Sequence, residues 1–174
     1  TAVGKDALLD ITTGSSNVAM GSAAGYNLTT GGSNVILGKN AGAGTLLASS
    51  CVIIGDSAGE GALTAAANGS ILIGLSAGAA NTIGGGNTAV GYQAMVANVQ
   101  GGANTSIGYQ SMLSFVADAD GHGSNTCVGH SAGKFIFTGT GNTFMGANAG
   151  LGITGTKLTG NNNTSIGTAS GKEL

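Results

Sequence analysis

Charged residues are scarce in this 174-residue sequence. They make up 7% of the chain, and five lysines and arginines stand against seven aspartates and glutamates, for a net charge of −2. So few basic residues leave no positive surface with which to hold nucleic acid. No apolar run approaches the roughly 20 residues that a membrane-spanning helix needs. We therefore expect neither nucleic-acid binding nor membrane insertion.

Proline and tryptophan are absent, whereas glycine accounts for 35 residues. Glycine at this level without a three-residue period excludes collagen and would ordinarily suggest disorder. Apolar residues nevertheless make up 41% of the chain and recur in register. An ordered repeat is the better interpretation.

The repeat is clearest where residues 87–95 (NTAVGYQAM) come back almost unchanged as residues 104–112 (NTSIGYQSM). Ten copies centre on Gly4, Gly21, Gly38, Gly55, Gly74, Gly91, Gly108, Gly129, Gly146 and Gly167, at gaps of 17, 17, 17, 19, 17, 17, 21, 17 and 21 residues. A near-fixed period predicts one solenoid domain over residues 1–174, in which neighbouring units bury one another.

The residues before each glycine predict a short strand. The position one before it is apolar in all ten copies, and the position three before it is always Val, Ile or Thr. This β-branched alternation is typical of a strand, and we expect these two positions to point into the coil. The fold class is then all-β, a parallel β-solenoid of ten rungs of about 17 residues. A second apolar position, seven or eight residues after the glycine, predicts a second strand-like side.

Alternation then places the position two before the glycine on the outer face. It is mostly apolar: Ala2, Ala19, Ile36, Ile53, Leu72, Ala89, Ser106, Cys127, Phe144 and Ser165. Because soluble proteins seldom expose large apolar patches, this ridge predicts that the chain assembles with itself. The threonines at 88, 105, 126, 143 and 164 would lie on the core side, which argues against an ice-binding surface.

Asparagine recurs four residues before the glycine, at 17, 34, 87, 104, 125, 142 and 163, with Cys51 and Ser70 in two middle rungs. Stacked asparagines can form a hydrogen-bonded ladder along the axis. The two cysteines, Cys51 and Cys127, lie four rungs or about 19 Å apart. A disulfide needs Cα atoms within about 7 Å, so we expect two free thiols.

Candidate binding residues fall in two places. Tyr92, Gln93, Tyr109 and Gln110 stack one rung apart and offer aromatic rings beside amides, a plausible glycan platform. Asp118 and Asp120, with a glycine after them, provide oxygen ligands that could hold Ca²⁺, although the distal glutamate of a full calcium loop is missing. We expect no catalytic residues and no other cofactor, because no carboxylate or serine is placed to exploit His130.

The unit Asn87-Thr88-Ala89-Val90-Gly91-Tyr92-Gln93-Ala94 resembles the repeats of trimeric tail fibres and tailspikes of bacteriophages, which often precede an endosialidase-like intramolecular chaperone domain. It is also similar to the left-handed β-roll heads of trimeric autotransporter adhesins. The resemblance implies a left-handed, parallel homotrimeric fibre, on a virion or outside the cell, that attaches to a host-surface glycan or protein.

Other functions stay open at this point. The chain begins and ends inside a repeat without caps, which suggests a fragment of a longer fibre or a subunit of a self-assembling extracellular filament. Residues 90–95 (VGYQAM) and their equivalents in every rung also fit the hexapeptide pattern of left-handed β-helix acyltransferases, but only one side of the coil obeys it. Few charges, no proline and no placed histidine disfavour that enzyme class.

Overall fold

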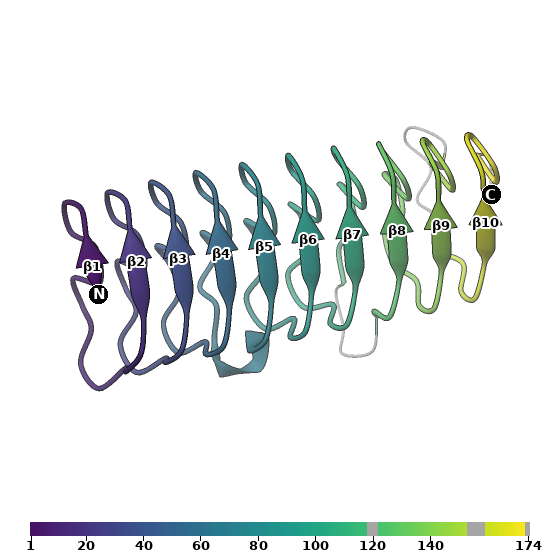
Figure 1. The fold of residues 1–174 in the computed structure, drawn as a ribbon. Helices are drawn as coiled ribbons and strands as arrows, with labels where there is room; N and C mark the ends of the chain where they lie inside the picture. Colours follow the sequence, from purple (N-terminus) through teal and green to yellow (C-terminus); the bar gives the residue numbers. More distant parts are fainter. Residues whose placement is uncertain (118–121, 153–158, 173–174) are drawn as a thin grey trace.

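The computed structural model describes residues 1–117, 122–152 and 159–172. Ten short strands form a single parallel sheet in sequence order, one strand per turn of the coil (Figure 1). The strands are β1 (Ala2–Val3), β2 (Val18–Met20), β3 (Val35–Leu37), β4 (Val52–Ile54), β5 (Ile71–Ile73), β6 (Thr88–Val90), β7 (Thr105–Ile107), β8 (Thr126–Val128), β9 (Thr143–Met145) and β10 (Thr164–Ile166). The predicted all-β parallel solenoid is confirmed.

Each strand pairs with the equivalent residues of the next turn. Val35, for example, lies opposite Val18 on one side and Val52 on the other. The rest of each turn is made of bends and tight turns, so the predicted second strand-like side is wrong. The backbone there still bonds between turns, as when the Thr29 amide donates to the Leu46 carbonyl at 3.0 Å. The first break in the period holds a short 3-10 turn, η1 (Ala65–Ala67).

The predicted orientation of the strand side chains is wrong. The position two before the glycine points into the coil: Ile36 and Ile53 are 0% exposed and Leu72 is 1% exposed. The flanking positions point outward, so that Met20 and Met145 are 47% and 42% exposed. Alternation separates two faces without saying which is inner. The width of the coil decides which face is inner. The narrow interior accommodates the column two before the glycine, which includes the small residues Ala19, Ala89 and Ser106, and excludes the column one before the glycine, whose residues are all large.

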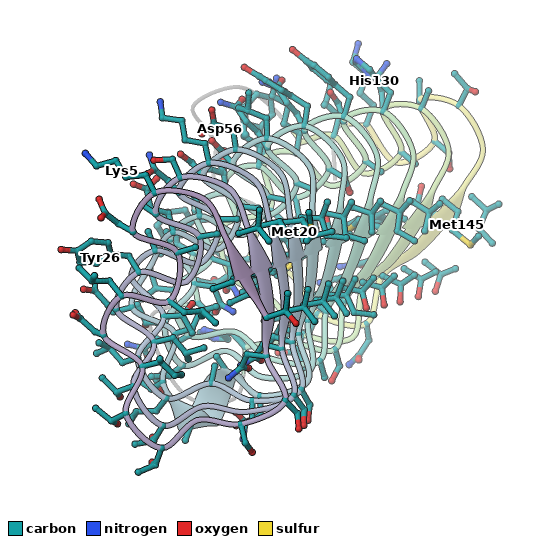
Figure 2. The ribbon with its side chains drawn as sticks, turned by 60° about the vertical axis from the view of Figure 1, so that its left-hand side comes forward. Lys5, Met20, Tyr26, Asp56, His130 and Met145 are labelled. Carbon is teal, nitrogen blue, oxygen red and sulfur yellow. The ribbon has the colours of Figure 1, made fainter. Side chains whose placement is uncertain are left out.

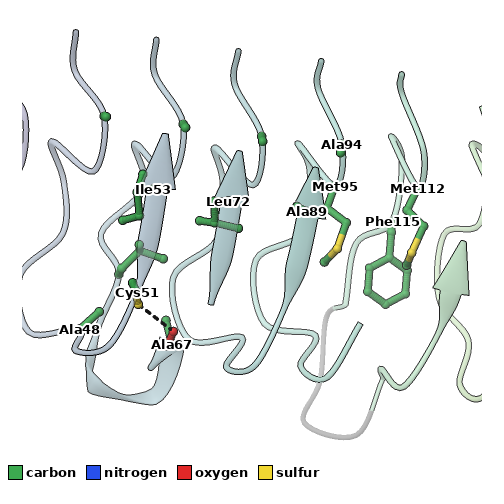
Figure 3. Packing of buried hydrophobic residues seen from close by; sticks show 14 of the residues in the cluster. Ala48, Cys51, Ile53, Ala67, Leu72, Ala89, Ala94, Met95, Met112 and Phe115 are labelled. Carbon is green, nitrogen blue, oxygen red and sulfur yellow. Dashed lines mark hydrogen bonds between the residues drawn. The ribbon is translucent and has the colours of Figure 1, made fainter. Parts of the chain in front are cut away.

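In eight of the ten turns the inner column is matched in volume by the position four after the glycine. Large Ile36, Ile53, Leu72, Cys127 and Phe144 are paired with Gly42, Gly59, Gly78, Gly133 and Gly150, whereas Ala2, Ala89 and Ser106 are paired with Leu8, Met95 and Met112. A β-carbon added to Gly78 would lie 2.6 Å from Leu72 Cδ2, so the leucine occupies that space. In Figure 3, Met95 and Met112 lie in the interior, Met95 beside the strand that carries Ala89 and Met112 next to Phe115. In these eight turns the two facing positions are inversely matched in size. Ala19 and Gly25 are both small, and there Leu8 and Ile36 of the neighbouring turns fill the space, since a β-carbon on Gly25 would lie 2.9 Å and 3.0 Å from their side chains.

The asparagine ladder is confirmed. The Oδ1 atom of each asparagine accepts a hydrogen bond from the backbone amide of the next rung. The Asn104 amide nitrogen lies 2.9 Å from Asn87 Oδ1, and the Asn125 amide nitrogen lies 3.0 Å from Asn104 Oδ1. Its Nδ2 atom donates to a carbonyl of the adjoining bend, as from Asn125 to Gly139 at 2.9 Å. Apart from the half-buried Asn163, these side chains are buried, and their hydrogen bonds compensate for lost hydration. In the fourth turn the Cys51 amide donates to Asn34 Oδ1, and the cysteine contributes no amide side chain of its own.

The central glycines form the corner after each strand. Gly55 has φ +133°, and a β-carbon there would lie 2.5 Å from the carbonyl oxygen of Gly74 in the next turn. Both the left-handed backbone and the close approach exclude a side chain. This explains why glycine occupies the position in every copy.

The volume pairing can be tested by exchanging it. Leu72→Ala should lower the free energy of unfolding by about 2–5 kcal/mol by opening a cavity, and Gly78→Met by about 1–3 kcal/mol by overfilling the turn. The double variant recreates the Ala89 and Met95 pair of the next turn, and Met95 itself has φ +52°. We expect it to recover most of the loss in chemical denaturation. Additive losses would contradict the pairing.

The ladder can be tested with Asn125→Ala. This change leaves the buried backbone amide of Asn142 without the acceptor that it now bonds at 3.0 Å. We expect a loss of about 1–3 kcal/mol in the free energy of unfolding, the usual cost of an unsatisfied buried donor. Asn27→Ala is the matched control, because the hydrogen bond described for Asn27 is made by its backbone amide. Equal effects of both variants would contradict a stabilising ladder.

Candidate functional site

Two surfaces are candidates for function, and the first is the outward face of the sheet. We call it the sheet face: the residues one and three before each central glycine, which are Val3, Val18, Met20, Val35, Leu37, Val52, Ile54, Ile71, Ile73, Thr88, Val90, Thr105, Ile107, Thr126, Val128, Thr143, Met145, Thr164 and Ile166, with Thr1 at the start. None is charged. Figure 2 shows their side chains in straight rows along the sheet, with Met20 and Met145 in the same row.

The sheet face changes character along its length. In β2 to β5 both of its rows are aliphatic, whereas from β6 onward the row three before the glycine is threonine. Thr88, Thr105, Thr126 and Thr143 are half-buried, and Thr164 is exposed. The prediction that these threonines lie on the core side is therefore wrong. The argument from orientation against a threonine-bearing binding surface no longer holds.

The second surface is an aromatic file at the corner after the sheet, defined as Tyr92, Tyr109 and His130. Each residue follows a central glycine, so the three rings stand in consecutive turns. The ring centroids of Tyr92 and Tyr109 are 5.0 Å apart, those of Tyr109 and His130 are 5.1 Å apart, and the planes are within 10° and 5° of parallel. The strand register, which repeats one turn after another, sets this stacking.

A row of polar side chains runs beside the aromatic file. Gln110 Nε2 donates to Gln93 Oε1 at 3.0 Å, and Lys134 Nζ donates to Gln110 Oε1 at 2.8 Å. The same ammonium lies 5.6 Å from the centroid of the Phe135 ring. This amide row, Gln93, Gln110 and Lys134, therefore forms a directed chain of hydrogen bonds that ends in a positive charge.

The structure brings together the four residues predicted as a binding platform, Tyr92, Gln93, Tyr109 and Gln110. Sequence reasoning missed His130 and Lys134 as members. His130 could have been found, because it occupies the same place after its glycine as Tyr92 and Tyr109. Lys134 could not, because it lies five residues after its own glycine and reaches back across a turn to Gln110.

The stacking limits what the aromatic file can do. The inner ring faces cover one another, so a ligand from solvent meets ring edges and hydroxyl groups. Tyr92 and Tyr109 are 41% and 47% exposed. Phenolic oxygens spaced by one turn are donors and acceptors suited to a polar ligand that lies along the axis.

The predicted calcium ligands Asp118 and Asp120 lie outside the described residues. Within the described part, no group of three or more His, Cys, Asp and Glu side chains gathers closely enough to hold a metal ion. The absence of a catalytic site stays a prediction.

Both cysteines are free thiols, as predicted, and both are buried. Burial raises the pKa of the Cys127 thiol to about 12. It also raises the pKa of Cys51, although hydrogen bonding to the backbone of Ser70 and Gly69 opposes the change. At neutral pH a thiol of raised pKa is a poor nucleophile.

Among the described residues, no helix is long and apolar enough to cross a membrane. Comparison of the chain with protein-family models, with curated proteins and with solved structures gave no match in any of the three.

Proposed function

We propose that this chain is a structural segment of an adhesive fibre, a homotrimer with the sheet faces packed around the common axis, and that it has no enzymatic activity. The observation that carries the proposal is the sheet face itself, an uncharged and largely apolar surface along the whole solenoid. Single apolar residues on a surface need no explanation, whereas a contiguous patch of this kind marks an interaction site.

The dimensions of the sheet face suit a subunit interface. Ten strands give nine steps of about 4.8 Å, so the face is about 43 Å long. A stable interface buries about 800 Å² on each partner, and the sheet face offers two rows of side chains along all ten strands. Val3, Ile107 and Ile166 are 52%, 39% and 67% exposed in the isolated chain, so burial would remove apolar area from water at both ends and in the middle.

A second copy of the same chain is the partner that fits best. The face repeats with the period of the solenoid, so an identical chain in parallel matches it turn for turn. Closed symmetry then leaves no sheet face exposed. The resemblance to trimeric tail fibres and autotransporter heads favours three copies. It also favours a location on a virion or outside the cell, in a fibre that reaches a host surface.

One observation favours a second candidate, an ice-binding surface. Five threonines stand in register on the exposed face from β6 to β10, where Thr105 lies opposite Thr88 on one side and Thr126 on the other. A flat, regularly spaced array of threonines without charge is the arrangement that such a surface needs. The two functions exclude each other, because trimerisation through the sheet face would cover the threonines.

The oligomer is tested by sedimentation velocity on the purified chain. We expect three times the chain mass, and we expect Ile107→Glu with Met145→Glu to yield monomers, because burying a carboxylate in an apolar interface is costly. Leu47→Glu is the control, because Leu47 is 42% exposed but lies outside the sheet face. A monomeric parent chain, or variants that stay assembled, would rule out this interface.

The ice-binding alternative makes the opposite prediction. A monomer would depress the freezing point below the melting point, and Thr126→Leu would reduce that gap severalfold by disturbing the middle of the row. A nanolitre osmometer measures both temperatures directly. We expect no gap for the parent chain; a clear one that Thr126→Leu abolishes would replace the fibre proposal.

A further inference from the structure

We propose that the aromatic file and the amide row together form a binding site for a linear acidic polysaccharide, with its chain along the solenoid axis and a carboxylate at Lys134. The site follows the corner after the sheet and lies away from the sheet face, as the positions of His130 and Met145 in Figure 2 show. It therefore stays accessible whether or not the sheet faces assemble. The inference goes beyond the proposed structural function by naming a ligand class.

The spacing of the aromatic file suits a polymer. Neighbouring ring centroids lie 5.0–5.1 Å apart, one ring in each of three consecutive turns. An extended 1,4-linked polysaccharide advances by a similar distance with each sugar. The phenol groups of Tyr92 and Tyr109 can therefore each meet the hydroxyl groups of one successive sugar, and the His130 ring meets the next. Since the rings are already stacked, little side-chain freedom is lost when a ligand binds.

Lys134 supplies the preference for an acidic sugar. Within the described part of the chain, the ion pair present joins Lys5 and Asp6, at 3.9 Å, so the Lys134 ammonium is not neutralised by a carboxylate there. Its bond to Gln110 Oε1 fixes its position and uses one of its three protons. The remaining protons can bind a carboxylate through charge-assisted hydrogen bonds.

The amide row reinforces this polarity. Lys134 donates to Gln110, and Gln110 donates in turn to Gln93, so each amide oxygen on the path is already an acceptor. Consecutive hydrogen bonds of this kind polarise one another, so that each strengthens the next. These two bonds leave one N–H of Gln110 and both N–H groups of Gln93 to donate to a ligand, which suits the oxygen-rich surface of a uronate polymer.

The test is isothermal titration of the full chain with two matched probes, β-1,4-linked mannuronate hexasaccharide and β-1,4-linked mannohexaose. They differ in the carboxylate alone. We expect the mannuronate probe to bind at least tenfold more tightly at low ionic strength, and added salt to reduce the difference. Tyr109→Ala should weaken binding of both probes at least tenfold, whereas Lys134→Gln should remove only the preference for mannuronate.

Tyr26→Ala is the matched control, because Tyr26 is a partly exposed tyrosine outside the aromatic file. It should leave both affinities unchanged. Circular dichroism establishes that each variant is folded before titration. Binding of neither probe, equal binding of both, or affinities unaffected by Tyr109→Ala and Lys134→Gln would overturn the inference. Sedimentation measures assembly separately, so the failure of one proposal is distinguishable from the failure of the other.

Discussion

Each turn of this chain is held in place by the turn before it and the turn after it. Strand residues bond in register from β1 to β10, and the bends between strands bond across turns as well. Because most of the backbone hydrogen bonds run between turns rather than within them, a turn has little stability of its own. The asparagine ladder extends the same interaction to side chains, since each Oδ1 accepts from the next turn.

Stacking at one fixed spacing has two consequences for the interior. It forces backbone corners into close contact, which is why a β-carbon at Gly55 would meet the carbonyl of Gly74. It also leaves a narrow core in which a large residue at one position limits the size of the residue that faces it. Leucine at 72 requires glycine at 78, whereas alanine at 89 permits methionine at 95.

The same stacking creates the two candidate functional surfaces. Any residue type that recurs at one place in the turn becomes a continuous row on the outside. Aliphatic and threonine residues produce the sheet face, and Tyr92, Tyr109 and His130 produce the aromatic file. Their chemistry differs, one face being suited to another copy of the chain and the other to a polar ligand. Because the rows lie on separate sides of the coil, the proposed assembly and the proposed ligand binding do not compete for the same surface.

The sequence by itself determined the period, the ten strands, the asparagine ladder and the unpaired thiols, because each depends on spacing along the chain. It also brought Tyr92, Gln93, Tyr109 and Gln110 together, since residues one period apart must stack.

The direction of the strand side chains was decided by the tertiary structure. Alternation is symmetric between two faces, and only the width of the closed coil selects Ile53 over Ile54 for the interior. One sign of that choice was already in the sequence, in the inverse sizes of the residues at 72 and 78 and at 89 and 95, but reading it requires knowing that the two positions face each other. The contact of Lys134 with Gln110 likewise depends on the tertiary structure, because the path of the chain between strands brings those side chains within hydrogen-bonding distance.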